Sequence, residues 1–326
     1  MTKGLYSLAE LRKAAVRVYQ EMQPTPQYAW PLLSDRLGAE VWLKHENHTP
    51  TGAFKIRGGI TFMDWLVREH PDVSGIVTAT RGNHGQAQAR AARAAGLQAV
   101  IVVPHGNSVE KNTAMRGFGA ELIEHGQDYN EAADYANQLA DERNLKLVTA
   151  FHPAIVLGVA SYGLELFDTA GALDAVYVPI GNGSGICGTI AARDALGLST
   201  KVIGVISDRA PAARLGLEAG KIASAGKANT FADGVAVRTP DREAFEMYSQ
   251  HVDHIVMVDD DAIADAIRII WQDTHNLAEG AGAVALAGMI REKELVRDKR
   301  VAAVLSGGNI DQSMVAAVLA GQTPLS

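Results

Sequence analysis

The sequence predicts an α/β protein built on open, twisted, mainly parallel sheets with helices on both faces. Short apolar runs rich in Val and Ile alternate with alanine-rich helical stretches, an order typical of strand–helix–strand units. The chain has 326 residues, of which 47% are hydrophobic. A chain of this size can bury a large core, either as one domain or as two lobes.

The expected elements follow from the spacing of the apolar residues. A surface helix is expected within residues 1–20, because Ser7 and Glu10 have the spacing of a capping box. Strands are expected at 41–44, 75–78, 99–103, 121–124, 147–149, 175–180, 201–206, 254–258 and 301–305. Helices are expected at 86–95, 109–117, 130–144, 161–169, 186–196, 260–274 and 279–293.

Charge and composition exclude several classes of partner. The formal net charge is -7 without a block of like charge, so we expect no nucleic-acid or membrane partner. No apolar run reaches the roughly 18 residues that span a bilayer. The only cysteine, Cys187, cannot form an intramolecular disulfide, which suits a reducing cytoplasm. We therefore expect a cytoplasmic protein.

Glycine-rich turns follow several predicted strands. The turn "GNGSGICG" at 181–188 contains a G-x-G-x-x-G pattern, and Asp208 follows about twenty residues later. This spacing fits a dinucleotide site, so a nicotinamide-dependent oxidoreductase is one alternative. However, "TRGNHG" at 80–85 and "LSGGNID" at 305–311 also follow strands. Several such loops indicate one small phosphorylated cofactor, with a phosphate at a helix N-terminus.

Five motifs occur in a characteristic order: "PTGAFKIRGG" around Lys55, "RGNHG", "VPIGNGSGICG", "ADGVAV" and "LSGGNID". With these motifs the chain resembles pyridoxal-phosphate enzymes of the tryptophan synthase β fold. It is most similar to the serine/threonine dehydratases and serine racemases. The resemblance implies a large cofactor-binding domain at 1–72 and 151–326, and a small mobile domain at 73–150. It also implies a homodimer.

The resemblance assigns the roles of individual residues. Lys55 matches the catalytic lysine that binds pyridoxal 5'-phosphate covalently, and Phe54 matches the residue that packs on its ring. Asn83 matches the partner of the ring hydroxyl, and Ser306 matches the partner of the ring nitrogen. The phosphate loop would consist of Gly181, Asn182, Gly183, Ser184 and Gly185. The substrate would contact Thr80, Arg81 and His84.

Arg81 departs from the racemase pattern, which has a serine as acid/base at this position. Arginine stays protonated, so it is a poor proton shuttle, and elimination is favoured over racemisation. We expect a dehydratase that converts a β-hydroxy amino acid to a 2-oxo acid and ammonia. Its substrate is L-threonine, L-serine or 3-hydroxyaspartate, whose second carboxylate would suit the Arg81 fork. Alternatively, Arg81 turns outward or pairs with an acid.

Other activities of the same fold stay open, namely racemisation and β-replacement with a second nucleophile. A catalytically inactive binding module is a further alternative. No metal site is expected, because Ile206 stands where relatives often have a glutamate ligand, and Asp208 is interpreted as a loop acid. Glu279 opens a predicted helix and is interpreted as mainly structural. The chain ends soon after the "SGGN" turn, so no regulatory domain is expected.

Overall fold

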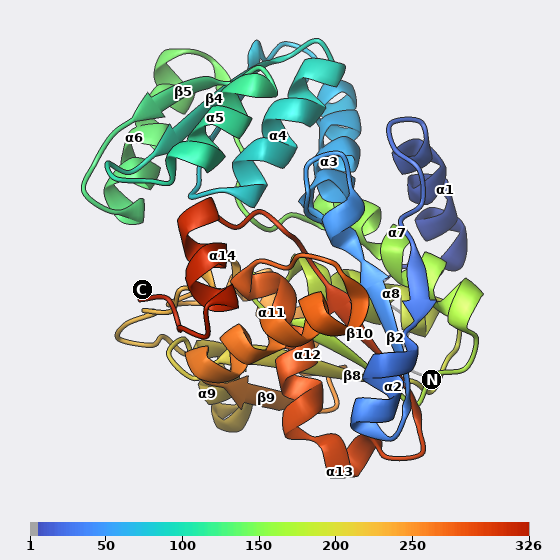
Figure 1. Ribbon diagram of the computed structural model, residues 1–326. Coiled ribbons are helices and arrows are strands. Elements are labelled where there is room, and N and C mark those ends of the chain that lie inside the picture. The colour runs from blue at the N-terminus through green and yellow to red at the C-terminus, as the bar shows by residue number, and fades with distance from the viewer. Residues whose placement is uncertain (1–5, 326) are drawn as a thin grey trace.

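The computed structural model describes residues 6–325, and its architecture consists of two sheets with helices on both faces of each (Figure 1). The larger sheet has six strands. In spatial order these are β1 (Gln27–Ala29), β2 (Glu40–His45), β10 (Arg300–Leu305), β7 (Ala175–Pro179), β8 (Lys201–Ser207) and β9 (Ile255–Val258). Strand β1 is antiparallel to β2, and the other pairings are parallel. The predicted fold class is therefore confirmed.

The smaller sheet has four parallel strands, in the order β5 (Glu121–Glu124), β4 (Gln98–Val103), β3 (Gly75–Ala79) and β6 (Leu145–Leu147). Its helices are α4 (Asn83–Ala94), α5 (Val109–Gly117) and α6 (Tyr129–Glu142). All of these elements fall within the range 73–150, and they form the upper part of Figure 1. That this part moves as a domain of its own stays a prediction.

Side chains alternate between the two faces of the large sheet, as expected for strands buried on both sides. On β10, Ala302 and Val304 join one core, while Val301, Ala303 and Leu305 join the other. The first core includes helices α1 (Leu8–Tyr19), α3 (Lys55–Glu69), α7 (Pro153–Ala170) and α8 (Ser184–Ala195). The second includes α2 (Pro31–Leu37), α11 (Asp260–Thr274) and α12 (Gly280–Arg291).

Helix α3 joins the two parts, because it packs against both α4 and α7. Its two glycines make this close packing possible. A Cβ added at Gly58 would lie 2.5 Å from Ile155 Cγ2 on α7, and one added at Gly59 would lie 3.1 Å from the Ala87 carbonyl oxygen on α4. The Gly-Gly pair after Lys55 therefore holds the lysine-bearing helix between the two parts.

Several elements differ from the sequence-based expectation. The helix expected at 161–169 begins at Pro153, where the His152 side chain accepts a hydrogen bond from Ala154 N and proline occupies the first turn. Strand β6 ends at Leu147, where the predicted strand begins. Helix α3, with 15 residues, was not among the expected helices. The other missed elements are short, namely β1, α2, α9 (Ala212–Ala219), α10 (Arg242–Ser249), α13 (Lys293–Val296), α14 (Gln312–Leu319) and the 3-10 turns η1 (Glu46–His48) and η2 (Asp233–Val235). Within the described residues, no helix combines the length and apolarity needed to cross a membrane.

Candidate active site

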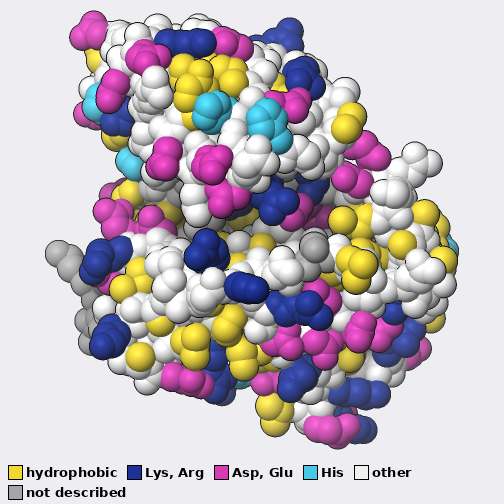
Figure 2. All heavy atoms as spheres, turned by 90° about the vertical axis from the view of Figure 1, so that its left-hand side faces the viewer, with side chains coloured by type: hydrophobic (Ala, Val, Ile, Leu, Met, Phe, Trp, Pro, Cys, Tyr) yellow, Lys and Arg dark blue, Asp and Glu magenta, His cyan; other side chains and the backbone are white. Residues whose placement is uncertain are grey.

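A cavity of about 620 Å³ is lined by loops from both parts of the molecule. On the surface, basic and acidic side chains gather where the upper and lower parts meet (Figure 2). The lining includes all of the residues predicted for the site, namely Phe54, Lys55, Thr80, Arg81, Asn83, His84, Gly181, Asn182, Gly183, Ser184, Gly185 and Ser306. The structure thus brings together side chains that are up to 252 positions apart in the sequence. Their individual roles remain predictions.

Lys55 is the first residue of α3 and lies on the cavity wall. Its Nζ atom donates a hydrogen bond to Ser184 Oγ at 3.2 Å and lies 4.8 Å from the centroid of the Phe54 ring. Burial lowers the pKa of Lys55 to about 8, although the charge of Glu279 opposes this shift. A much larger fraction of this amine is therefore free near neutral pH than in an ordinary lysine.

The loop from Gly181 to Gly185 connects β7 to the N-terminus of α8. A Cβ at Gly181 would lie 2.2 Å from the Gly234 carbonyl oxygen, and Gly183 has a φ of +95° that favours glycine. Gly183 caps α8 without a side-chain hydrogen bond. The first turn of α8 therefore presents backbone N–H groups toward the cavity, a suitable environment for a phosphate.

Asn83 lies at the start of α4 and is held by two side chains from other elements. Its Nδ2 donates to Glu279 Oε1 at 2.5 Å, and its Oδ1 accepts from Asn309 Nδ2 at 2.8 Å. Burial raises the pKa of Glu279 to about 7, although Lys111 and the Asn83 hydrogen bond favour the charged form. Glu279 is therefore one of the hydrogen-bonded residues that line the cavity, whereas the sequence predicted a mainly structural role for it.

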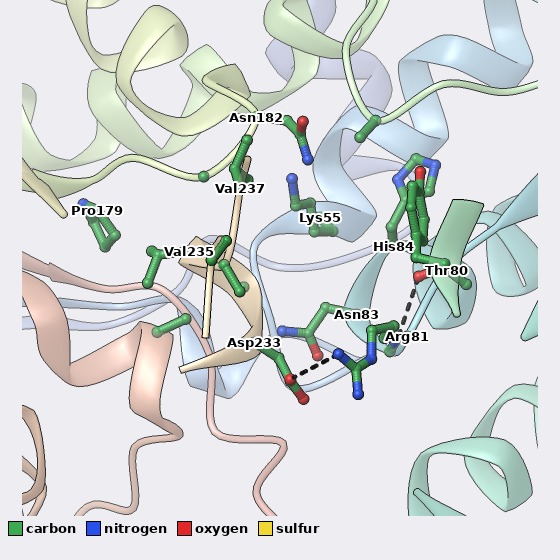
Figure 3. A pocket seen from close by; sticks show the side chains of 18 of the residues that line it. Lys55, Thr80, Arg81, Asn83, His84, Pro179, Asn182, Asp233, Val235 and Val237 are labelled. Atoms are coloured by element: carbon green, nitrogen blue, oxygen red, sulfur yellow. Dashed lines mark hydrogen bonds and ion pairs between the residues drawn. The ribbon is translucent and has the colours of Figure 1, made fainter. Parts of the chain in front are cut away.

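His84 is buried and lines the cavity beside Thr80 (Figure 3). Burial lowers the pKa of His84 to about 3, and the charge of Lys55 lowers it further. Within the described part of the chain, its Nε2 atom has no hydrogen-bond partner. A buried polar atom without a partner is uncommon, so a ligand group in the cavity would satisfy it. Thr80 Oγ1 accepts a hydrogen bond from Gly82 N at 3.1 Å and shapes this turn.

Arg81 and Lys111 both approach Asp233. Arg81 Nη1 lies 4.0 Å from Asp233 Oδ1, and Lys111 Nζ lies 3.0 Å from Asp233 Oδ2. The Arg81 side chain is 57% exposed and lies at ion-pair distance from Asp233, in agreement with the alternative that it turns outward or pairs with an acid. Sequence reasoning missed Lys111 and Asp233. Asp233 stands in the "ADGVAV" motif, which offered a signal, but a lysine on a short helix offers none.

Ser306 lies at the end of β10, where its hydroxyl donates to the Ala281 carbonyl oxygen at 3.2 Å. Its own carbonyl oxygen accepts a hydrogen bond from Phe54 N at 3.0 Å, which connects the loop after β10 to the residues just before α3. Ser306 and Phe54 therefore line the same region of the cavity.

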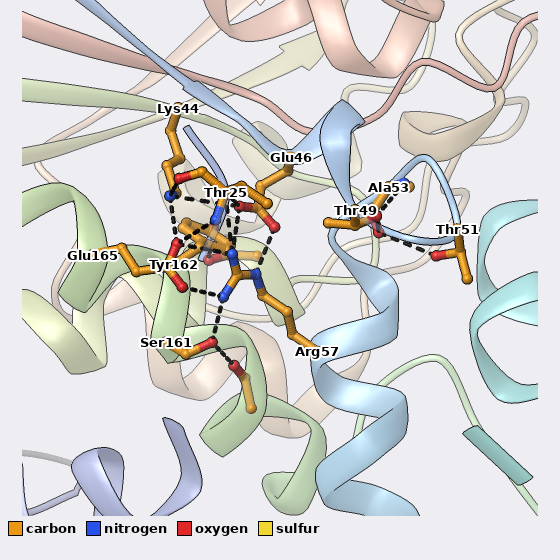
Figure 4. Close-up of polar contacts among 12 residues, drawn as sticks. Thr25, Lys44, Glu46, Thr49, Thr51, Ala53, Arg57, Ser161, Tyr162 and Glu165 are labelled. Carbon is orange, nitrogen blue, oxygen red and sulfur yellow. Dashed lines mark hydrogen bonds and ion pairs between the residues drawn. The ribbon is translucent and has the colours of Figure 1, made fainter. Parts of the chain in front are cut away.

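A buried ionic cluster supports the start of α3 from behind (Figure 4). Arg57 donates to both oxygens of Glu46 at 2.7 and 3.0 Å, and to Glu165 Oε1 at 2.6 Å. Lys44 donates to Glu165 Oε2 at 2.5 Å. The Lys44, Glu46 and Arg57 side chains are fully buried. Two cations and two carboxylates thus anchor the helix that begins at Lys55.

Two further expectations concern a dinucleotide site and a metal site. Asp208, which made a dinucleotide site conceivable, is not among the residues that line the cavity. Among the described residues, no group of three or more His, Cys, Asp or Glu side chains is arranged to hold a metal ion.

Comparison with known families agrees with this geometry. Residues 18–307 match the family model described as pyridoxal-phosphate dependent enzyme. The chain belongs to this family. Accordingly, it depends on pyridoxal phosphate, and the predicted resemblance to the serine/threonine dehydratases and serine racemases is confirmed.

Similar members of the family are known from several organisms. The chain is 35% identical to a biosynthetic L-threonine dehydratase of Pasteurella multocida, over 93% of this chain and 60% of that protein. It is 34% identical to an L-threonine ammonia-lyase of Thermotoga maritima, over 95% of this chain and 77% of that protein. The chain thus spans about 60% of the length of the biosynthetic dehydratases it matches.

Solved structures of the family share the fold. A processed threonine deaminase isoform from Solanum lycopersicum superposes with a TM-score of 0.90 at 31% identity, covering 97% of this chain and 95% of that one. A maize serine racemase also gives 0.90, at 25% identity and 97% coverage of both chains.

The cavity fits pyridoxal phosphate. Lys55 offers an amine with a lowered pKa, and the glycine loop before α8 offers N–H groups for the phosphate. Asn83 keeps one amide hydrogen beyond the one given to Glu279, and the Ser306 hydroxyl lies on the same wall.

Proposed function

We propose that the protein is a dehydratase that eliminates the hydroxyl of a β-hydroxy amino acid and releases a 2-oxo acid and ammonia. The observation that carries this proposal is the position of Lys55. Its Nζ lies 3.2 Å from Ser184 at the start of α8, and its pKa is lowered to about 8 by burial. The similar ammonia-lyase of Thermotoga maritima supports this reaction class.

When bound, pyridoxal phosphate withdraws electrons from the α-carbon of an attached amino acid and makes the α-proton acidic. Lys55 would remove this proton, because its Nζ faces the cavity and about half of the amine is free of its own proton near pH 8. The electrons of the broken C–H bond form a double bond to the β-carbon as the C–O bond breaks. The hydroxyl leaves as water with a proton that Lys55 returns.

The product then hydrolyses, and the water consumed balances the water lost in the elimination. The remaining residues would bind and orient. Asn83, fixed by Glu279 and Asn309, would hold the ring. Ser306 would offer the ring nitrogen a neutral partner, which would make a long-lived carbanion unfavourable and support rapid loss of the hydroxyl.

A racemase of the same fold is the second candidate, since a maize serine racemase is a structural neighbour. Racemisation needs an acid/base on the second face of the substrate. By the resemblance, Arg81 would occupy the position of this acid/base, and an arginine cannot deliver a proton near neutral pH. The buried His84 is held neutral by its environment. We therefore favour elimination.

The substrate proposal includes L-threonine, L-serine and 3-hydroxyaspartate. The relatives that act on L-threonine by name support the first. Arg81 supports the third, because its guanidinium lies on the cavity wall beside the carboxylate of Asp233. The homodimer and the cytoplasmic location also remain proposals.

The test is a panel of β-hydroxy amino acids incubated with the purified holoenzyme. We expect equal amounts of 2-oxo acid and ammonia, and loss of both in the Lys55→Ala variant. Lys13→Ala, which removes an exposed lysine on α1, is the matched control. Racemised substrate without ammonia would refute the dehydratase, and product that requires added sulfide would indicate a β-replacement enzyme.

A further inference from the structure

Asp233 bridges two cations from the other part of the molecule. Arg81 precedes α4 and Lys111 lies on α5, both associated with the four-stranded sheet, whereas Asp233 begins η2 between α9 and α10. Each of its carboxylate oxygens faces a different cation, Oδ1 toward Arg81 at 4.0 Å and Oδ2 toward Lys111 at 3.0 Å. One carboxylate therefore interacts with two positive charges at the edge of the cavity.

The Lys111 side chain reaches the cavity along the backbone of the "RGNHG" turn. A Cβ at Gly82 would lie 2.9 Å from Lys111 Cδ, so glycine leaves room for the aliphatic stem. The Lys111 side chain is only 12% exposed. Burial works against its charge, but Asp233 and Glu279 outweigh burial and raise the pKa of Lys111. The amine is thus a fixed positive charge aimed at the cavity.

Asp233 is less enclosed than the lysine it pairs with. Its side chain is 35% exposed, and the distance to Arg81 is at the limit of an ion pair. A partly exposed carboxylate can turn toward water at little cost, whereas a mostly buried lysine left without an anion is costly. A second carboxylate inside the cavity could therefore take the place of Asp233 between the two cations.

We infer that Asp233 is an exchangeable counter-ion, and that Arg81 and Lys111 select substrates with a carboxylate attached to the β-carbon. The substrate class is then the hydroxylated dicarboxylic amino acids. This inference rests on the proposed elimination for its turnover predictions, but its binding predictions stand independently of it. The α-carboxylate needs no such pair, because the N–H groups of the loops can bind it.

The first test measures binding of succinate to the holoenzyme by calorimetry at fixed ionic strength. Succinate has two carboxylates on a four-carbon chain, and butyrate is the matched ligand without the second one. Lys111→Met should weaken succinate binding by about tenfold or more, the loss expected for one charge-assisted hydrogen bond. Lys111→Arg should retain most of the affinity. Asp233→Asn should tighten succinate binding, because the competing anion is removed, and should leave butyrate unaffected.

An exposed pair serves as the control. Lys201 Nζ lies 3.1 Å from Asp253 outside the cavity, so Lys201→Met and Asp253→Asn should leave succinate binding unchanged. Weaker succinate binding in Asp233→Asn would show that Asp233 itself holds the ligand and would overturn the inference. Unchanged binding in Lys111→Met would also overturn it.

The second test compares turnover. In Lys111→Met, kcat/KM for 3-hydroxyaspartate should fall at least about tenfold relative to that for L-serine. An equal fall for both substrates would indicate a structural role and would contradict the inference. A preference for O-phosphoserine over 3-hydroxyaspartate would indicate that the two cations select a phosphate rather than a carboxylate. That result would also contradict the inference. If no β-hydroxy amino acid releases ammonia, the proposed function fails, while succinate binding still tests the counter-ion exchange.

Discussion

The side-chain amide of Asn83 donates to Glu279 at 2.5 Å and accepts from Asn309 at 2.8 Å. These contacts join the start of α4 to the start of α12 and to the loop after β10. Because the amide nitrogen donates one hydrogen bond and the amide oxygen accepts another, the orientation of the Asn83 side chain is fixed before any ligand binds. The second N–H of the amide is left for the cavity.

The protonation of Glu279 should make stability depend on pH. Its pKa is raised to about 7 in the folded protein, against about 4.5 in the unfolded chain. Between these values the folded state keeps a proton that the unfolded state loses, so rising pH destabilises the fold, by about 3 kcal/mol in all. Glu279→Gln should remove this decline from urea unfolding of the apoprotein at pH 4.5 to 7. The exposed Glu142→Gln should keep it, and an identical decline in both variants would contradict the assignment.

The lowered pKa of Lys55 should appear in cofactor binding. The free amine is the reactive form, and its fraction rises with pH to a plateau just above the pKa of about 8. The rate at which apoenzyme captures pyridoxal phosphate in a borohydride-reducible form should therefore level off near pH 9. A rate that continues to rise toward pH 10.5, as for an exposed lysine, would show that burial does not lower this pKa.

The buried ionic cluster should be sensitive to the loss of one partner. Glu165→Gln removes the carboxylate shared by Lys44 and Arg57, which leaves buried positive charge uncompensated. We expect a loss of about 3–5 kcal/mol in the free energy of unfolding, measured in urea. Arg12→Met breaks an exposed pair with Asp168 and should cost less than about 1 kcal/mol. Similar losses in the two variants would refute this difference.

The glycine loop should tolerate no side chain at Gly181. A Cβ there would lie 2.2 Å from the Gly234 carbonyl oxygen, so the loop must shift and its N–H groups must move. Gly181→Ala should weaken binding of pyridoxal phosphate at least about tenfold, as measured by equilibrium dialysis. Gly117→Ala, with no atom within 4 Å of the added Cβ, should bind normally. Normal binding by both variants would show that Gly181 is not part of the phosphate-binding loop.

The sequence was sufficient for the fold class and for many of the cavity residues that lie in motifs, although Asp233 in the "ADGVAV" motif was missed. Lys55, Asn83 and the loop from Gly181 all lie in motifs that contain several glycines, so a short stretch of sequence reveals them. Short elements such as β1 and α2 were missed, because three to seven residues show too little periodicity.

Long-range partners could not be predicted in the same way. Lys111 becomes a cavity residue only because α5 packs beside the Gly82 turn and because Asp233, 122 positions later, lies opposite. Nothing in the local sequence distinguishes it from a solvated lysine. Glu279 had a visible position at a helix start, but its hydrogen bond to Asn83 depends on how the two parts meet.

The most direct measurement of the central claim is peptide mapping of the borohydride-reduced holoenzyme by mass spectrometry. Reduction fixes the cofactor on the lysine that holds it. The account predicts one modified peptide, with the added mass on Lys55 at the start of α3. Modification of another lysine, or none at all, would contradict it.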